Sequence, residues 1–137
     1  MAGQMIIEGC QEFMDAVYKD AATPEAKELI LFSNDEVITD ATVNADLTEI
    51  TTNGGEKVTL TAGTWDAATA ADPIVSRYNG VTGVVFTITG ALTVYGWAVR
   101  GVTSTKIYGA ENFGLKTFVN GNEFTCAPID MKFNIPE

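Results

Sequence analysis

The chain has 137 residues, of which 46% are hydrophobic and 19% are charged, and its formal net charge is −10. This length suits one domain whose single core needs no metal or disulfide to fold. The charge is uneven, because residues 1–72 hold 14 acidic and 3 basic side chains whereas residues 73–137 hold 4 acidic and 5 basic ones. With no cluster of Lys or Arg, we expect neither nucleic acid nor a membrane as a partner.

The first predicted element is an amphipathic helix from near Glu8 to Lys19. Its apolar side chains follow the i, i+3, i+4, i+7, i+8 spacing: Cys10, Phe13, Met14, Val17 and Tyr18. A helix of about three turns is not stable alone, so its apolar stripe must dock on its own sheet or on a neighbouring subunit. The residues before it lack the basic and long apolar regions of a secretory signal.

A polar stretch separates the next two predicted elements. Glu28–Ser33 has the apolar content of a central strand, and Lys57–Ala62 alternates as a half-buried strand does. Residues 34–55 between them form the longest irregular stretch, with room for a brief strand near Thr48–Thr51. A loop of this length in a compact domain is usually functional or mobile. Trp65 is the one large side chain of the turn-rich segment that follows.

The remainder of the chain is a ladder of short alternating runs broken by Gly and Asn. The predicted strands are Ile74–Tyr78, Val84–Thr89, Leu92–Arg100, Thr105–Tyr108, Lys116–Val119, Glu123–Cys126 and Ile129–Asn134. Asn120-Gly121 predicts a type I′ hairpin, since both residues tolerate a positive φ. The strand at Leu92–Arg100 is apolar on both faces, which favours a central position, and Gly96 within it would admit a close backbone or ring.

These elements predict a mainly β fold with one short N-terminal helix. Closely spaced antiparallel strands of this kind indicate a β-sandwich, jelly-roll-like, although the strand order is not visible in the sequence. We expect an arm and amphipathic helix over residues 1–22 and a single β-sandwich domain over residues 23–137.

The side chains that usually carry catalysis are scarce. The chain has no histidine, which removes the usual general base, the Ser-His and Cys-His nucleophile pairs and the commonest zinc ligand. Cys10 and Cys126 fit small buried apolar positions in a chain that folds in a reducing cytosol. No phosphate-binding or dinucleotide-binding glycine motif occurs. We therefore expect a chain that is not an enzyme, with no catalytic residue, cofactor or metal.

Carboxylates leave two alternatives open. Four acidic residues of the polar stretch offer oxygen atoms to calcium, although their spacing does not match a helix-loop-helix calcium site: Asp35, Asp40, Asp46 and Glu49. Trp65, flanked by Asp66 and Asp72, offers an aromatic platform for a sugar. The interpretation that we favour is that the acidic side chains solvate loops and the aromatic side chains fill a core or an interface.

Five segments, in order, resemble small virion structural proteins of tailed bacteriophages. They are LILFSNDEV (Leu29–Val37), GGEKVTLTAGTW (Gly54–Trp65), TGALTVYGWAVRG (Thr89–Gly101), IYGAENF (Ile107–Phe113) and FVNGNEFTCAPIDMKFNI (Phe118–Ile135). The match covers roughly residues 28–135, and the ordered set is more specific than any one piece. The chain departs from the pattern at Glu56, where the family often has Tyr, and the N-terminal helix matches only loosely.

The resemblance implies a virion protein without enzymatic activity. We expect a capsid decoration, or cement, protein made in the host cytoplasm and located on the capsid surface, with the major capsid protein and itself, as homodimer or homotrimer, as partners. The expected contact residues are Ile6, Phe13, Tyr18, Asp35, Asp40 and Trp65. The alternatives are a tail-fibre or receptor-binding module that recognises a host-surface glycan, and a head–tail connector component.

Overall fold

The computed structural model describes residues 7–20 and 25–133 of the chain. Within these ranges the fold is mainly β, with antiparallel sheets and one short N-terminal helix, as the sequence predicts. The helical elements are α1 (Ile7–Met14), a π-helical turn at Asp15–Asp20, and two 3₁₀ turns at Asn44–Asp46 and Ala62–Thr64. The strands are β1 (Lys27–Phe32), β2 (Val58–Leu60), β3 (Ile74–Arg77), β4 (Val84–Thr87), β5 (Leu92–Gly101), β6 (Ile107–Phe118), β7 (Glu123–Cys126) and β8 (Asp130–Phe133).

The chain divides into two compact units, each discontinuous in sequence. Unit 1 contains residues 1–24, 61–83 and 127–137, and unit 2 contains residues 25–60 and 84–126. The helix therefore shares its unit with β3 and β8, whereas the remaining strands lie in unit 2. These units cut the chain at places other than residue 22, and the division into an arm of 1–22 and a domain of 23–137 stays a prediction.

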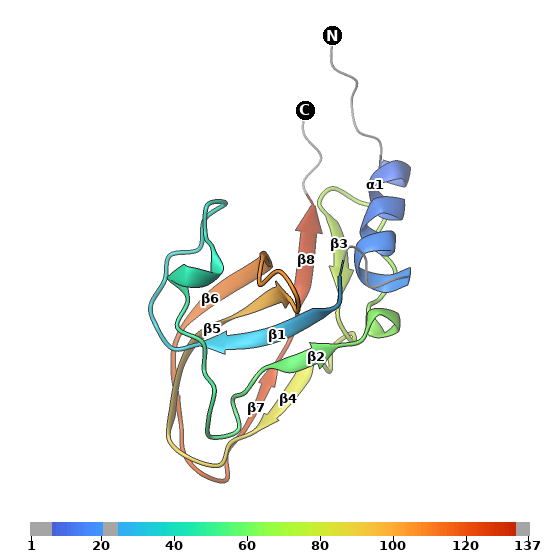
Figure 1. The fold of residues 1–137 in the computed structure, drawn as a ribbon. Helices are drawn as coiled ribbons and strands as arrows, with labels where there is room; N and C mark the ends of the chain where they lie inside the picture. The colour runs from blue at the N-terminus through green and yellow to red at the C-terminus, as the bar shows by residue number, and fades with distance from the viewer. Residues whose placement is uncertain (1–6, 21–24, 134–137) are drawn as a thin grey trace. The chain divides into compact units, whose positions relative to one another are not determined.

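Unit 2 is built on a four-stranded antiparallel sheet in the order β2-β1-β5-β6 (Figure 1). β1 and β5 are the central strands, and the run from Leu29 to Phe32 on β1 is fully buried. The position of β5 between β1 and β6 confirms the central strand that its two apolar faces predict. At Gly96 an added Cβ would collide with the carbonyl of Glu111 and the ring of Phe32, so the expected close approach is confirmed.

The strands β4 and β7 form a separate two-stranded sheet within unit 2. Phe124 on β7 packs against Phe113 and Phe118 of β6, with ring centroids 5.8 Å and 5.1 Å apart, and stacks on Phe86 of β4. These rings join the faces of the two sheets in a sandwich-like arrangement. In the part of the chain that the structure describes, the eight strands form one sheet of four and two of two, rather than the two larger sheets of a jelly roll.

Two predictions about the second half are wrong. Thr105–Tyr108 and Lys116–Val119 are not separate strands, because Ile107–Tyr108 and Lys116–Phe118 both belong to β6, whose alternation is interrupted by register shifts against β5. Asn120-Gly121 does not close a hairpin, because β6 pairs with β5 and β7 pairs with β4. Only Gly121 of this pair has a positive φ, 92°, which is the requirement of a type II turn. The Asn122 N–H donates to the Val119 carbonyl across that turn at 3.1 Å.

In unit 1, the helix packs on its own chain, with Cys10, Met14 and Tyr18 buried. These residues are four apart, and the helix continues after Met14 as a wider π-helical turn. Phe13, which belongs to the stripe predicted from a regular α-helix, is 57% exposed. The buried stripe thus follows every fourth residue from Cys10 and leaves Phe13 outside it.

Trp65 is the centre of unit 1. It is 1% exposed, and its ring lies 5.0 Å from the ring of Tyr18 and 5.1 Å from that of Tyr78. Helix side chains hold the same segment, since Gln11 donates to the Ala68 carbonyl and the Ala68 N–H donates to Asp15. The helix and the Trp65 segment therefore fix each other by packing and by hydrogen bonds to the backbone.

Candidate functional site

The long polar stretch of unit 2 forms a loop, residues 33–48, whose two ends lie side by side. The Ser33 N–H donates to the Thr48 carbonyl at 2.9 Å. The side chain of Asn34 closes the loop twice, because its amide donates to the Asp46 carbonyl at 2.8 Å and its oxygen accepts the Thr48 N–H at 2.7 Å. The predicted brief strand near Thr48–Thr51 appears as a single bridge between Phe32 and Glu49. This is the compact geometry of an Ω-loop.

One face of the four-stranded sheet receives this loop. Leu47 joins a buried cluster with Ile30, Phe32 and Ala98, and Ile38 packs against the same cluster. On β6, the side-chain amide of Asn112 donates to the Glu36 carbonyl at 2.8 Å and to the Asp35 carboxylate at 2.9 Å. The loop is therefore attached along its length and not only at its ends.

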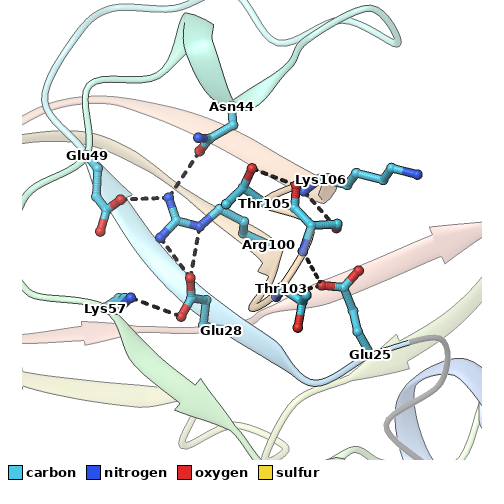
Figure 2. A network of polar contacts seen from close by, with 10 residues as sticks. Glu25, Glu28, Asn44, Glu49, Lys57, Arg100, Thr103, Thr105 and Lys106 are labelled. Atoms are coloured by element: carbon cyan, nitrogen blue, oxygen red, sulfur yellow. Dashed lines mark hydrogen bonds and ion pairs between the residues drawn. The ribbon is translucent and has the colours of Figure 1, made fainter.

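Arg100 on β5 provides the strongest attachment, and Figure 2 shows its contacts. Its Nε and Nη2 atoms both donate to Glu28 Oε1 on β1, at 3.0 Å and 2.7 Å. Its Nη1 atom donates to Asn44 Oδ1 within the loop at 3.1 Å and to Glu49 Oε1 just after the loop at 2.6 Å. One guanidinium thus ties two adjacent strands to the loop that covers them.

Burial makes the pair of Arg100 and Glu28 sensitive to the loss of either partner. The side chains of Arg100 and Glu28 are 6% and 5% exposed, and Lys57 contributes a second positive charge 3.6 Å from Glu28. Desolvation lowers the pKa of Arg100, but its hydrogen bonds with Glu49 and Glu28 and their negative charges outweigh this, so the pKa is raised overall. Breaking a buried pair by removing one partner costs about 3–5 kcal/mol, because the other charge stays buried without compensation.

A second carboxylate fixes the turn between β5 and β6. Glu25 Oε1 accepts the N–H groups of Thr103 and Ser104, each at 2.9 Å. Its hydrogen bonds with Ser104 hold the pKa of Glu25 below its usual value. Nearby, desolvation raises the pKa of Tyr108, and burial lowers that of Lys27, whose ammonium lies 5.0 Å from the Tyr108 ring centroid. The charged groups at this end of the sheet are thus engaged in holding backbone segments.

The predicted contact residues of the loop lie on its surface. Asp35 and Asp40 are exposed, and two apolar side chains accompany them, Val37 at 76% and Val43 at 54% exposure. The loop therefore presents acidic and apolar groups from a framework that Arg100 and Asn34 hold. Whether these groups contact a partner stays a prediction.

The other predicted contact residues, all in unit 1, have different positions. Phe13 is exposed, whereas Tyr18 and Trp65 are buried against each other at 8% and 1% exposure. The expectation that Trp65 is an exposed aromatic is wrong, and the platform on which the sugar alternative depended is closed by Tyr18 and Tyr78. Ile6 lies outside the described residues.

The acidic residues of the loop do not assemble into a metal site. Across residues 7–20 and 25–133, no group of three or more His, Cys, Asp or Glu side chains is arranged to hold an ion. Asp46 instead accepts the Val43 N–H at 2.9 Å, and Glu49 accepts from Arg100. Among the same residues, no helix has the length and apolar character to cross a membrane.

Sequence reasoning did not find the Arg100 network. The available signal was a charged residue in each of two buried runs, Glu28 before LILF and Arg100 after WAV. A charge in a central strand requires a partner, so two opposite charges in such strands indicate that the strands are neighbours. Asn44 and Glu49 carry no such signal, since polar residues are ordinary in a loop.

Comparison with known proteins identified no relative of this chain. No protein-family model matches the chain, and neither a curated protein nor a solved structure is significantly similar to it.

Proposed function

We propose that this chain is a non-enzymatic structural protein of a tailed-bacteriophage virion. More specifically, we propose a capsid decoration protein that stabilises the head shell by bridging major capsid subunits from the capsid surface. The ordered resemblance over residues 28–135 supports this, and its segments contain β2, β5, β7 and β8 together with much of β1 and β6. The proposed partners are the major capsid protein and further copies of the chain.

The observation that carries the proposal is the attachment of the loop 33–48. A bridging protein needs a contact surface that keeps its shape, because preorganisation reduces the entropy lost on binding. Asn34 and Asn112 hydrogen-bond to the loop backbone, and Arg100 holds the side chain of Asn44. Asp40 and the two exposed valines lie on the surface of the loop, and Asp35 is exposed while its carboxylate accepts from Asn112. This combination suits docking on a basic and partly apolar protein surface.

A glycan-binding role is less well supported. The aromatic platform proposed for it was Trp65, which is 1% exposed and covered by two tyrosine rings. No observation favours a head–tail connector over a decoration protein. Both alternatives are distinguished from the main proposal by where the chain is found on the virion.

The test is binding of the purified chain to expanded empty shells of its own phage, followed by cryo-electron microscopy of the decorated shells. We expect co-sedimentation with shells and density between neighbouring shell subunits. Asp40→Lys should weaken binding about tenfold or more, because it reverses a charge on the contact loop. Glu56→Lys, the same reversal at an exposed position outside the loop, should leave it within about twofold. Density only at the tail, or binding only to host cells or polysaccharide, would refute the decoration role.

A further inference from the structure

The last part of β6 is an exposed edge whose pattern is self-complementary. β6 is the outer strand of the four-stranded sheet, and its residues 114–117 are all exposed. Edge strands offer unpaired backbone groups to another strand, and proteins usually protect them with bulges or charges. The first part of β6 has such protection in its two register shifts against β5, at Tyr95 and between Val99 and Arg100.

The segment Lys116–Phe118 is different, because it pairs with β5 in regular register. Its neighbours on the solvent-facing side are apolar. Leu115, at the end of the register shift before this segment, is 59% exposed, and Val119, just after the end of β6, is 61% exposed. With Thr117 between them, they alternate along one face. An exposed apolar alternation on an unprotected edge is the pattern that pairs with another strand.

We propose that the segment 115–119 is a self-association edge, where β6 pairs antiparallel with β6 of a second copy of this chain. A two-fold axis at Thr117 places the two Thr117 residues opposite each other. Leu115 of each copy then faces Val119 of the other copy on one face of the joined sheet. Lys116 faces Phe118 on the other face, so no like charges are opposed.

Charge distribution favours a copy of the same chain at this edge. The chain carries a net charge of −10, but residues 73–137 carry 4 acidic and 5 basic side chains. β6 itself carries one of each sign, Glu111 and Lys116. Two copies that meet along β6 therefore meet no net repulsion from the charges of that strand itself.

The extent of pairing is limited at both ends. At one end is the register shift that contains Gly114, whose φ is 86°. At the other end, Val119 donates its N–H to Asn122 and accepts the Asn122 N–H at its carbonyl. A pair of such short strands buries less than the roughly 1,000 Å² of a stable interface, so we expect a weak dimer with a Kd between about 10 μM and about 1 mM. This inference is independent of the virion role.

Sedimentation velocity over protein concentrations from about 10 μM to about 1 mM tests the proposal. We expect a reversible monomer–dimer equilibrium that Leu115→Lys weakens about tenfold or more, since it removes the apolar cross-strand pair. The matched control is Val81→Lys, which makes the same change of charge at an exposed apolar residue outside β6 and the loop and should alter the Kd less than about twofold. A chain that stays monomeric throughout, or a dimer that resists Leu115→Lys, would overturn the proposal.

A cross-linking experiment tests the register. Under mild oxidation, Thr117→Cys should form a disulfide-linked dimer, because residues opposite each other in an antiparallel pair have Cβ atoms about 5 Å apart. Thr93→Cys is the control, since Thr93 is exposed and pairs with Thr117 but lies on the central strand β5. Native Cys10 and Cys126 are buried and should not contribute. Equal cross-linking of the two variants would refute the register.

Discussion

Two irregular segments of the molecule are held in place by different chemistry. In unit 1, the segment around Trp65 is anchored by an indole ring packed against Tyr18 and Tyr78. In unit 2, the loop 33–48 is anchored by the guanidinium of Arg100. An apolar anchor contributes stability in proportion to the area it buries and does not depend on charge. A buried ionic anchor stabilises only while its charged partners remain, and its loss leaves a buried charge without compensation.

The two cysteines allow the units to be compared separately. Cys10 lies in unit 1 and Cys126 in unit 2, and each is 2% exposed. A buried thiol reacts with an alkylating reagent only when its surroundings open. The labelling rate of each cysteine, read by peptide mass spectrometry, therefore reports the local stability of its own unit.

The largest effect is expected from Trp65→Ala. Loss of a buried indole from the core of unit 1 should lower the free energy of unfolding by about 3–5 kcal/mol. Cys10 should be labelled faster by a larger factor than Cys126, because the cavity lies in unit 1. Urea denaturation and thiol labelling measure the two effects. Val81→Ala, at a residue of unit 1 that is 87% exposed, is the control and should cost less than about 0.5 kcal/mol. An unchanged stability would contradict the anchoring role of Trp65.

Arg100→Met should have the next largest effect, about 3 kcal/mol, since it leaves Glu28 buried without its main partner. Here Cys126 should show the larger acceleration of labelling, the reverse of the result for Trp65→Ala. The control is Arg77→Met, which breaks the bidentate pair with Asp130 at a partly exposed site and should cost much less. If Arg77→Met costs as much as Arg100→Met, burial is not the cause of the effect.

The stability of unit 2 should also depend on pH through the Cys126 thiol. Burial, with a contribution from Glu111, raises the pKa of the Cys126 thiol from 9.0 to about 12. The folded state therefore retains a proton that the unfolded state releases above its own pKa. This stabilisation is complete below about pH 9 and is lost as the pH rises toward 12, by about 1.4 kcal/mol per pH unit.

Urea denaturation of the protein and of Cys126→Ala at about pH 8, 9 and 10 measures this contribution. The variant should lose stability less steeply with rising pH, whatever its stability at neutral pH. Parallel curves for the two proteins would show that the thiol makes no such contribution.

The smallest effects are expected at the solvent side of the network. Glu49→Gln keeps a hydrogen-bond acceptor at a side chain that is 25% exposed, and should cost about 1 kcal/mol. Lys57→Met should cost between about 0 and 1 kcal/mol, because the lysine side chain is 56% exposed. Thermal denaturation of these two variants and of Arg100→Met ranks the three substitutions by their loss of stability. If all three substitutions lower the free energy of unfolding equally, then the contribution of each residue to the network does not decrease with its exposure to solvent.

Local patterns in the sequence determined much of this protein. Period-two alternation and Gly or Asn breaks were enough for the positions of most strands, for the long irregular stretch and for the buried position of Cys126, and helical spacing was enough for that of Cys10. The reason is that alternation records directly which side chains face a core. The crowding at Gly96 was likewise visible, because a glycine inside an apolar strand signals a close neighbour.

Only the tertiary structure decided which segments meet. The choice of β4 rather than β6 as the partner of β7 overrode the hairpin signal of Asn120-Gly121, because pairing depends on the packing of whole sheets and not on one turn. Packing left Phe13 outside the buried stripe of the helix, and rings from distant segments enclosed Trp65. The Arg100 network joins residues from two strands and one loop that are up to 72 positions apart. Periodicity carries no information about such contacts, since they form only after the strands that bring them together have paired.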